Sequence, residues 1–465
     1  MRRQTITAFL SILILFVLPL NAFCDEPTVL TLDRSIEIAL ENSLSLRSAC
    51  EGVKQAEARR KEAGTGFLPA LTAEYNIIRV DEAPSFEIPA VPSTTIEFTP
   101  KICDHEFINL KQVIDIEGTP AMELDAGERT STNLTASLTQ PLFTGFSLIK
   151  GYKIARKEVE GAKAREEAAR QDLILRVHNA YFGVLRAGRL LDVAEEAVEM
   201  LEAHVRVAKE FFDVGMIPKN DLLMAEVELA NIRHDLLRAS NGAEMAEAAF
   251  NLTLRRDIDA TVELEDVPNE NREQVDLEAC FRKALSKRPE LEEVRGLVEQ
   301  ADLAVGLARS GFFPSLAVVG NLTREEGGFT GDREYWSVVG VATWTPWDWG
   351  ATYYRMKAGK AERNRAELGA EELEDAILLD VKQAYLNLME AEQRIDVSRK
   401  EVEQAEENFR ITEEQYKANV TTSTQVLDAR TMLSRARVNS FNALADLNLS
   451  RISLKRATGT LSGNH

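Results

Sequence analysis

The sequence predicts a mostly α-helical protein with a transmembrane β portion, built from two similar halves. Two observations predict this fold class. First, residues 31–71 and 276–316 align without a gap, 245 positions apart, with 12 identities in 41 positions. Second, each half holds a long heptad pattern of apolar residues, which specifies coiled-coil helices. Each half is therefore expected to run as helix, strand, strand and long helical hairpin.

Residues 1–24 are expected to be a secretory signal peptide, because two arginines precede an apolar run over 6–20 and small residues lie just before Asp25. Cleavage after Cys24 is expected; the alternative is that Cys24 is a lipidated N-terminal residue. The chain has 55 Lys and Arg against 75 Asp and Glu, a net charge of -20. Such a surface repels nucleic acid, so we expect no nucleic-acid partner.

No other apolar run approaches the ~20 residues of a membrane-spanning helix, so membrane insertion after export must use strands. Cys50, Cys103 and Cys280 remain after cleavage. Three cysteines cannot all pair, and no CxxC motif is present. We expect them to be small buried residues, with their redox state left open.

Residues 25–70 are expected to hold a periplasmic helix, over 32–63, which ends at Gly64 and Gly66. A β-hairpin over 71–142 follows. Its strands are predicted at 71–80 and 130–142, and the second alternates apolar with polar residues. Between them, residues 81–129 carry five prolines and scattered acidic residues, and are expected to form a long extracellular loop.

Residues 143–257 are expected to form the first long helical hairpin, with its tip near 213–221. A helix over 147–213 would be ~100 Å long at ~1.5 Å per residue. Gly215 and Pro218 mark the turn at the tip. The seam of the ascending helix is apolar at alternating spacings of four and three. It comprises Leu173, Val177, Ala180, Val184, Ala187, Leu191, Ala194, Val198, Leu201, Val205, Ala208 and Phe212.

The second half repeats this order. It is expected to contain a connector and helix over 258–312, a β-hairpin over 313–346, a long helical hairpin over 347–458 with its tip near 417–425, and a tail over 459–465. Asn419 stands at the second tip turn, since asparagine tolerates a left-handed backbone. Trp336 and Trp344 lie eight residues apart on one strand face, ~26 Å at ~3.3 Å per residue. This favours a membrane girdle, and the alternative is that both are core residues.

Four strands cannot form a closed membrane sheet alone, because open sheet edges leave backbone N–H and C=O groups unpaired in lipid. The smallest usual membrane barrel has about eight strands. Several copies are therefore expected to share one barrel and to pack their helical hairpins into a tube. The polar side of the alternating strands indicates a water-filled lumen.

These features resemble the TolC-like outer-membrane efflux protein family over about residues 30–460. The resemblance is carried by the repeated helix, the Gly-Phe-x-Pro corners at 66–69 and 311–314, the Pro-x-x-x-Gly turns starting at Pro141 and Pro346, the Ala-Tyr pairs at 180–181 and 384–385, and the tip turns. It implies a homotrimer with a shared twelve-stranded β-barrel in the outer-membrane lipid and an α-barrel tunnel in the periplasm. A periplasmic adaptor and an inner-membrane pump are the implied partners.

In this family the helix tips close the periplasmic end of the tunnel. The resemblance implies that Asp428 belongs to a ring of aspartates in the constriction, and that Asp221 is the partner of the gate tyrosine, here Tyr416. Gln425 stands where some relatives carry another aspartate, and Thr421 where some carry a gate arginine. Three Asp428 carboxylates around an axis would repel one another and favour a bound cation. The alternative is that Asp428 is a solvated residue in a first helical turn.

An enzyme is not expected, because the sequence has no Gly-x-x-x-x-Gly-Lys, His-Glu-x-x-His or Gly-x-Ser-x-Gly motif. The five histidines have no metal-ligand spacing, so no catalytic, metal or cofactor site is predicted. The expected function is an outer-membrane exit duct that passes small molecules in a tripartite efflux system. The alternatives are the duct of a one-step (type I) protein secretion system, and an exported coiled-coil tether.

Overall fold

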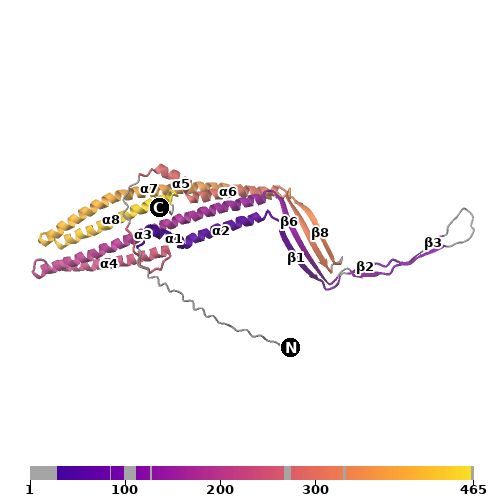
Figure 1. Cartoon of the computed structure of the whole chain (residues 1–465), viewed down its shortest axis with the longest axis horizontal. Coiled ribbons are helices and arrows are strands. Elements are labelled where there is room, and N and C mark those ends of the chain that lie inside the picture. The colour runs from indigo at the N-terminus through magenta and orange to yellow at the C-terminus, as the bar shows by residue number, and fades with distance from the viewer. Residues whose placement is uncertain are drawn as a thin grey trace, which may run out of the picture. The chain divides into compact units, whose positions relative to one another are not determined.

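The chain is described here by a computed structural model that covers residues 29–83, 85–98, 112–125, 128–266, 274–327 and 331–461. The expected signal peptide and Cys103 lie outside these residues. The chain divides into two compact units. The tip unit comprises Met1–Leu44, Arg170–Cys280 and Val381–His465, and the sheet unit comprises Ser45–Ala169 and Phe281–Asp380 (Figure 1).

Helices form most of both units. They are α1 (Leu32–Asn42), α2 (Leu44–Thr65), α3 (Ser147–Asp213), α4 (Lys219–Leu254), α5 (Leu277–Lys287), α6 (Pro289–Arg309), α7 (Ala351–Lys417) and α8 (Ser423–Ala457), with a 3-10 turn, η1 (Ser310–Phe312), after α6. The two longest, α3 and α7, have 67 residues each. The limits predicted for the first long helix, residues 147 and 213, are confirmed.

The repeated short helix is interrupted, which corrects the continuous helix expected over 32–63. Ser43 is extended (φ −61°, ψ 125°) between α1 and α2, and its N–H donates to the Ala39 carbonyl at 2.9 Å. The equivalent residue of the second copy, Arg288, is extended (φ −65°, ψ 121°) between α5 and α6. Arg288 precedes Pro289, and proline disfavours the helical conformation of the residue before it. Both copies therefore bend at the same position.

The heptad seams are buried as predicted. The second half carries a matching seam of twelve positions on α7, of which nine are buried and Val402, Phe409 and Thr412 are half-buried. The buried nine are Ile377, Val381, Ala384, Leu388, Ala391, Ile395, Ser398, Ala405 and Tyr416. In α3, all twelve predicted positions are buried or half-buried. The period of the apolar pattern thus located both long helices correctly.

Tyr181 of α3 anchors the N-terminal segment in the tip unit. Its side chain is fully buried, and its hydroxyl lies 2.7 Å from the Glu265 carbonyl oxygen and 3.0 Å from that of Leu30. Leu30 also forms a parallel bridge with Leu264, in which the Leu30 N–H donates to the Glu263 carbonyl at 2.8 Å. Burial, followed by the negative charge of Glu265, raises the pKa of Tyr181 to about 12.

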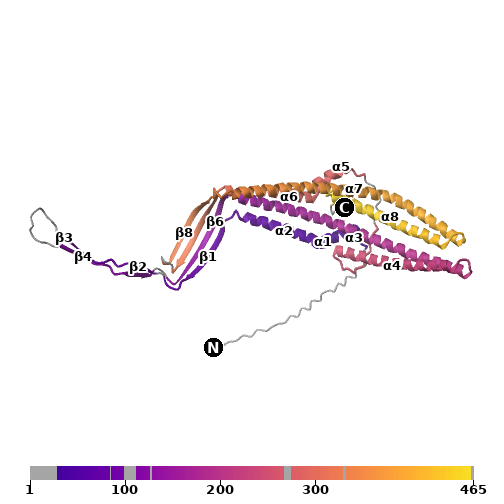
Figure 2. The same ribbon diagram turned by 180° about the vertical axis from the view of Figure 1, so that it is seen from behind.

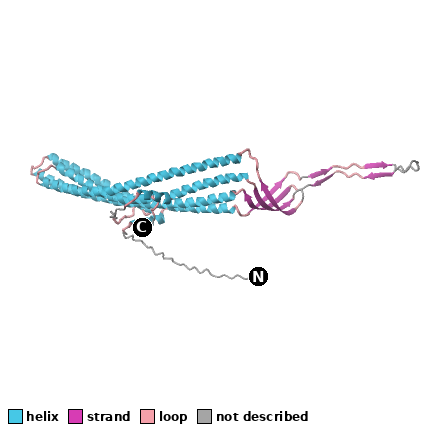
Figure 3. Cartoon of the chain, turned by 90° about the horizontal axis from the view of Figure 1, so that it is seen from above, coloured by secondary structure: helices cyan, strands magenta, loops and turns pink. Residues whose placement is uncertain are grey.

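Four strands of the sheet unit form one antiparallel sheet, and the strands are magenta in Figure 3. Their order in the sheet is β1-β6-β7-β8. They are β1 (Ala70–Arg79), β6 (Thr130–Thr144), β7 (Ser315–Glu326) and β8 (Arg333–Thr343). The register aligns Leu71, Leu138, Gly320 and Val338 in one row and Thr72, Ser137, Asn321 and Ser337 in the next. One face of the sheet is therefore mainly apolar and the other polar, as the alternation in the second strand predicted. Within the described residues, β1 and β8 each have one unpaired edge.

A close contact fixes the turn that joins β6 to α3. Gly145 has a φ of +61°, and a Cβ atom there would lie 2.6 Å from the Ser310 carbonyl oxygen. The next residue, Phe146, also has a positive φ of 71°, and its ring meets that of Phe313 edge-on at 5.9 Å. Only glycine fits the first position, because any side chain would overlap backbone atoms.

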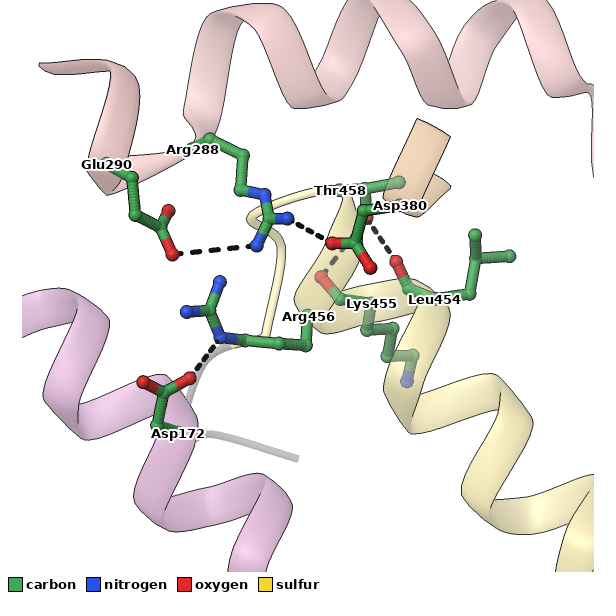
Figure 4. Close-up of polar contacts among 8 residues, drawn as sticks. All are labelled: Asp172, Arg288, Glu290, Asp380, Leu454, Lys455, Arg456 and Thr458. Atoms are coloured by element: carbon green, nitrogen blue, oxygen red, sulfur yellow. Dashed lines mark hydrogen bonds and ion pairs between the residues drawn. The ribbon is translucent and has the colours of Figure 1, made fainter. Parts of the chain in front are cut away.

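Two buried arginines, one in each unit, are paired with carboxylates (Figure 4). In the sheet unit, Arg288 forms ion pairs with Asp380 of α7 and with Glu290, the latter at 3.5 Å. In the tip unit, Arg456 Nε of α8 donates to Asp172 Oδ1 of α3 at 2.7 Å. Because an unpaired buried cation is costly, these carboxylates allow both arginines to lie among packed helices.

Residues 81–129, expected to form a long loop, hold regular strands in their described part, and the sequence pattern did not predict these strands. The strands form two antiparallel pairs: β2 (Ser85–Ile88) with β5 (Met122–Asp125), and β3 (Thr94–Phe98) with β4 (Gln112–Ile116). The Val91–Thr119 bridge between these pairs continues the register of both. We call residues 85–98 and 112–125 the ribbon. Prolines 89, 92 and 120 fall between its ladders and interrupt the alternation in the sequence.

Candidate functional site

The candidate gate lies at the two helix turns of the tip unit, which are found at the same end of that unit in Figures 1 and 2. Gly215 (φ 75°) and Asn419 (φ 56°) both adopt the left-handed conformation predicted for them. At each turn the N–H of the left-handed residue bonds three residues back and the next N–H five back: Gly215 to Phe212 and Met216 to Phe211, then Asn419 to Tyr416 and Val420 to Gln415. Both tips therefore end in a Schellman motif.

The residues after the turns begin α4 and α8. Pro218 is extended at the start of α4, and the Asp221 N–H donates to the Pro218 carbonyl at 3.1 Å. In α8, Gln425 and Asp428 are both exposed. Thr421 is half-buried, and its Oγ1 atom is buried without a hydrogen-bond partner among the described residues. These side chains are the predicted constriction residues, and their role in a gate stays a prediction.

Tyr416 of α7 is 4% exposed and packs against α3. Its ring centroid lies 4.8 Å from that of His204 and 5.7 Å from that of Phe211. His204 Nε2 in turn lies 2.7 Å from Ser423 Oγ, in the first turn of α8. The second tip is therefore tied to α3 by an aromatic contact and a hydrogen bond.

Asp221, the predicted partner of Tyr416, influences the buried Tyr416 hydroxyl through its charge. Burial, and after it the negative charge of Asp221, raises the pKa of the Tyr416 hydroxyl, while the Ser423 hydroxyl opposes the rise. The Tyr416 hydroxyl is buried and has no partner with good hydrogen-bond geometry among the described residues. A direct hydrogen bond between Tyr416 and Asp221 therefore stays a prediction.

Sequence analysis missed Arg430, which lines a cavity of about 370 Å³ together with His204, Glu413 and Tyr416. Arg430 is 4% exposed, and its Nε and Nη2 atoms have no hydrogen-bond partner among the described residues. Burial lowers the pKa of Arg430, and the charge of Glu228 opposes this. Burial also lowers the pKa of His204, with Glu413 opposing and Arg430 adding to the shift. The sequence signal that could have identified Arg430 is its position four residues after Val426, which is buried on the same helix face.

The two tryptophans predicted to lie in a membrane girdle are exposed. Trp336 on β8 is 77% exposed, and Trp344, just after β8, is 59% exposed. Trp344 Nε1 donates to the Phe312 carbonyl at 3.2 Å. Neither residue is in the core of this chain, which removes the alternative considered for them. Sequence analysis did not assign a role to Trp347 and Trp349, which are also exposed and whose rings lie 5.8 Å apart.

Among the described residues, no helix combines the length and apolar character needed to cross a bilayer. The same residues contain no group of three or more His, Cys, Asp and Glu side chains that could hold a metal ion. The described residues include two of the cysteines, Cys50 and Cys280. Cys280 is buried as expected, whereas Cys50 is only half-buried and its Sγ lies 3.2 Å from Glu166 Oε1.

Comparison with known proteins gives a consistent picture. The sequence profile of the outer membrane efflux protein family matches residues 35–254 and 281–460. Outer membrane protein TolC of Vibrio cholerae is 26% identical over 348 residues, covering 73% of this chain and 79% of TolC. Outer membrane efflux protein BepC of Brucella suis is 20% identical over 444 residues, covering 93% of this chain and 86% of BepC.

Among solved structures, the CmeC outer membrane channel of Campylobacter jejuni superposes with a TM-score of 0.75 at 18% identity, covering 93% of this chain and 87% of CmeC. The open state of the Neisseria gonorrhoeae MtrE outer membrane channel gives a TM-score of 0.71 at 18% identity, covering 93% of this chain and 91% of MtrE. At such identity these likenesses show the fold alone. The family profile matches both halves of the chain, and the chain therefore belongs to the outer membrane efflux protein family.

Proposed function

We propose that this protein is the outer-membrane exit duct of a tripartite efflux system. Small molecules would pass from an inner-membrane pump and a periplasmic adaptor through its lumen to the exterior. The observation that carries the proposal is a four-stranded sheet with one apolar face, one polar face and two unpaired edges. Lipid can cover the apolar face and water the polar face, but the edges need further strands.

The simplest source of those strands is other copies of the chain. Strands β1 and β8 run in opposite directions and each has an unpaired edge, so β8 of one copy can form an antiparallel pair with β1 of the next. Three copies give twelve strands, which is the homotrimer that the family resemblance implies. The exposed tryptophans Trp336 and Trp344 would then lie at the two lipid interfaces, where tryptophan side chains are favoured.

We expect the helix turns of the tip unit to form the periplasmic constriction. Asp428 is exposed on α8, two residues before the buried Arg430. In a trimer, three exposed Asp428 carboxylates around the axis would attract cations. Tyr416, with Asp221 as its partner, would stabilise the closed tip, since the buried Tyr416 ring packs on His204 and Phe211 of α3.

The proposal is tested on the purified protein in detergent. A trimer band that dissociates on heating, together with single-channel conductance in a planar bilayer, is the expected result. A boiled sample is the control for the first measurement and empty detergent micelles for the second. A monomer that stays in solution without detergent and forms no channels would refute the proposal.

A further inference from the structure

The two faces of the ribbon differ in chemistry. Directly opposed residues of an antiparallel pair project to the same side, and successive residues alternate between sides. One side, which we call the apolar face, carries the opposed pairs Phe86–Leu124, Ile88–Met122, Thr94–Ile116 and Ile96–Ile114. The other side, the acidic face, carries the pairs Glu87–Glu123, Thr95–Asp115 and Glu97–Val113. Because the Val91–Thr119 bridge keeps the same register, each face continues along the whole ribbon.

Nothing among the described residues covers the apolar face. Phe86 is 60% exposed, and the other apolar side chains of this face are exposed as well. A two-stranded hairpin alone is marginally stable in water, and a contiguous exposed apolar surface marks an interaction site. Each strand of the ribbon runs over 14 residues, about 45 Å at ~3.3 Å per residue, so this surface is long as well as apolar.

The position of the ribbon in the chain points to its partner. The β1–β6 ladder ends where the Val80 N–H donates to the Arg129 carbonyl at 2.9 Å, and the ribbon starts five residues later at Ser85. In the proposed trimer, three ribbons would therefore start at one rim, each on a short connection. Tethering of this kind gives an effective concentration in the millimolar range, at which even weak self-association is favoured.

The acidic face disfavours two other arrangements, contact between two acidic faces and contact of the ribbon with lipid. Glu87 and Glu123 oppose each other directly, and like charges in this position already repel within one ribbon. Two acidic faces would repel each other more strongly. A ribbon with its apolar face on lipid would keep its carboxylates in water but hold them within about a Debye length of an anionic surface, which repels them. Contact between apolar faces of two ribbons covers the apolar side chains, leaves every carboxylate in water and avoids this repulsion.

We propose that the three ribbons of the trimer pack their apolar faces against one another outside the membrane. This self-association surface rests on the trimeric duct proposed above and adds an element to it. The acidic faces point to solvent, and the ribbon bundle lies over the mouth of the duct. Molecules leaving the lumen must pass between or beside the ribbons.

Cysteine cross-linking tests the proposal with a matched pair of variants. Ile96→Cys places a thiol on the apolar face of the ribbon. Glu97→Cys changes the next residue and places a thiol on the acidic face. Both are made in a background in which Cys50, Cys103 and Cys280 are replaced by serine. The intact trimer is treated with a short bis-maleimide, and cross-linked dimer is measured after denaturation.

We expect at least fivefold more cross-linked dimer from Ile96→Cys than from Glu97→Cys. Equal cross-linking of the two variants, more from Glu97→Cys, or none from either in a heat-modifiable trimer would overturn the proposal and leave the duct itself in place. The trimer is first measured with the native cysteines, and its absence there would refute the duct and this proposal together. As a second measurement, added protease should cleave the ribbon at least fivefold faster in Ile114→Asp than in Asp115→Asn. Equal cleavage rates would also count against the ribbon bundle.

Discussion

The buried hydroxyl of Tyr181 provides a sharp test of how the N-terminal segment is held on α3. Tyr181→Phe removes the hydroxyl that lies 2.7 Å from the Glu265 carbonyl oxygen and 3.0 Å from that of Leu30. The ring stays, so no cavity of side-chain size is made. Loss of a buried hydrogen bond that leaves an acceptor without its donor costs about 1–3 kcal/mol.

That cost should appear locally, as opening of the Leu30–Leu264 bridge. Since about 1.4 kcal/mol is a factor of ten, hydrogen exchange at the Leu30 and Glu265 amides should accelerate roughly 5- to 100-fold in Tyr181→Phe. The equivalent residue of the second half, Tyr385, is only half-buried, so Tyr385→Phe is the matched control. Unchanged exchange in Tyr181→Phe, or the same acceleration in Tyr385→Phe, would contradict this account.

The same hydroxyl sets a pH dependence whose sign follows from its environment. Burial raises the pKa of Tyr181 from 10.0 to about 12, so the folded state favours the neutral phenol. The stabilising contribution is complete below pH 10 and is lost as pH rises from 10 through about 12. The difference in tyrosinate absorbance between the wild type and Tyr181→Phe should therefore have its midpoint near 12. A midpoint near 10 would show that the hydroxyl is solvated.

Four further predictions concern the duct. Asp428→Ala should weaken block of the channel by divalent cations, measured by bilayer conductance, and unaltered block would remove Asp428 from the constriction. Deletion of residues 81–129 should raise single-channel conductance, because the ribbon bundle lies over the exit; an unchanged value would place the ribbons away from it. Gly215→Ala should destabilise the first tip by about 1–2 kcal/mol, because Gly215 has a φ of +75°. Asn419→Gly should have little effect or be mildly stabilising, and thermal dissociation of the trimer reports both.

The long helices could be predicted from sequence because their signal is redundant. Twelve seam positions in α3 repeat without a slip, and Gly145 and Gly215 mark the two ends. The interruption at Ser43 carries no such mark, since leucine follows it. Only the second copy shows the cause, because Arg288 precedes Pro289. Because Ser43 aligns with Arg288, the break that Pro289 predicts in the second copy could have been predicted in the first copy as well.

The ribbon and Arg430 escaped prediction for opposite reasons. In the ribbon, prolines 89 and 92 replace residues that would have completed the alternation, so a regular pairing looked irregular. Arg430 was overlooked because a guanidinium is expected at the surface, and only the tertiary contacts of α8 bury it. The roles assigned to Asp428, Gln425, Thr421, Asp221 and Tyr416 depend on neighbouring subunits, which no single-chain sequence pattern encodes.

The ribbon occurs in one half of the duplicated chain only. Equivalent residues lie 245 positions apart in the short helices but 204 apart in the long ones, because β7 and β8 are joined by a short connection where β1 and β6 carry the ribbon. A trimer would thus repeat the helical hairpin motif six times around its axis and the ribbon only three times. The pseudo-sixfold periodicity of the periplasmic wall would give way to true threefold symmetry at the cell exterior. Three side windows, one between each pair of ribbons, would then be the natural outlets for cargo.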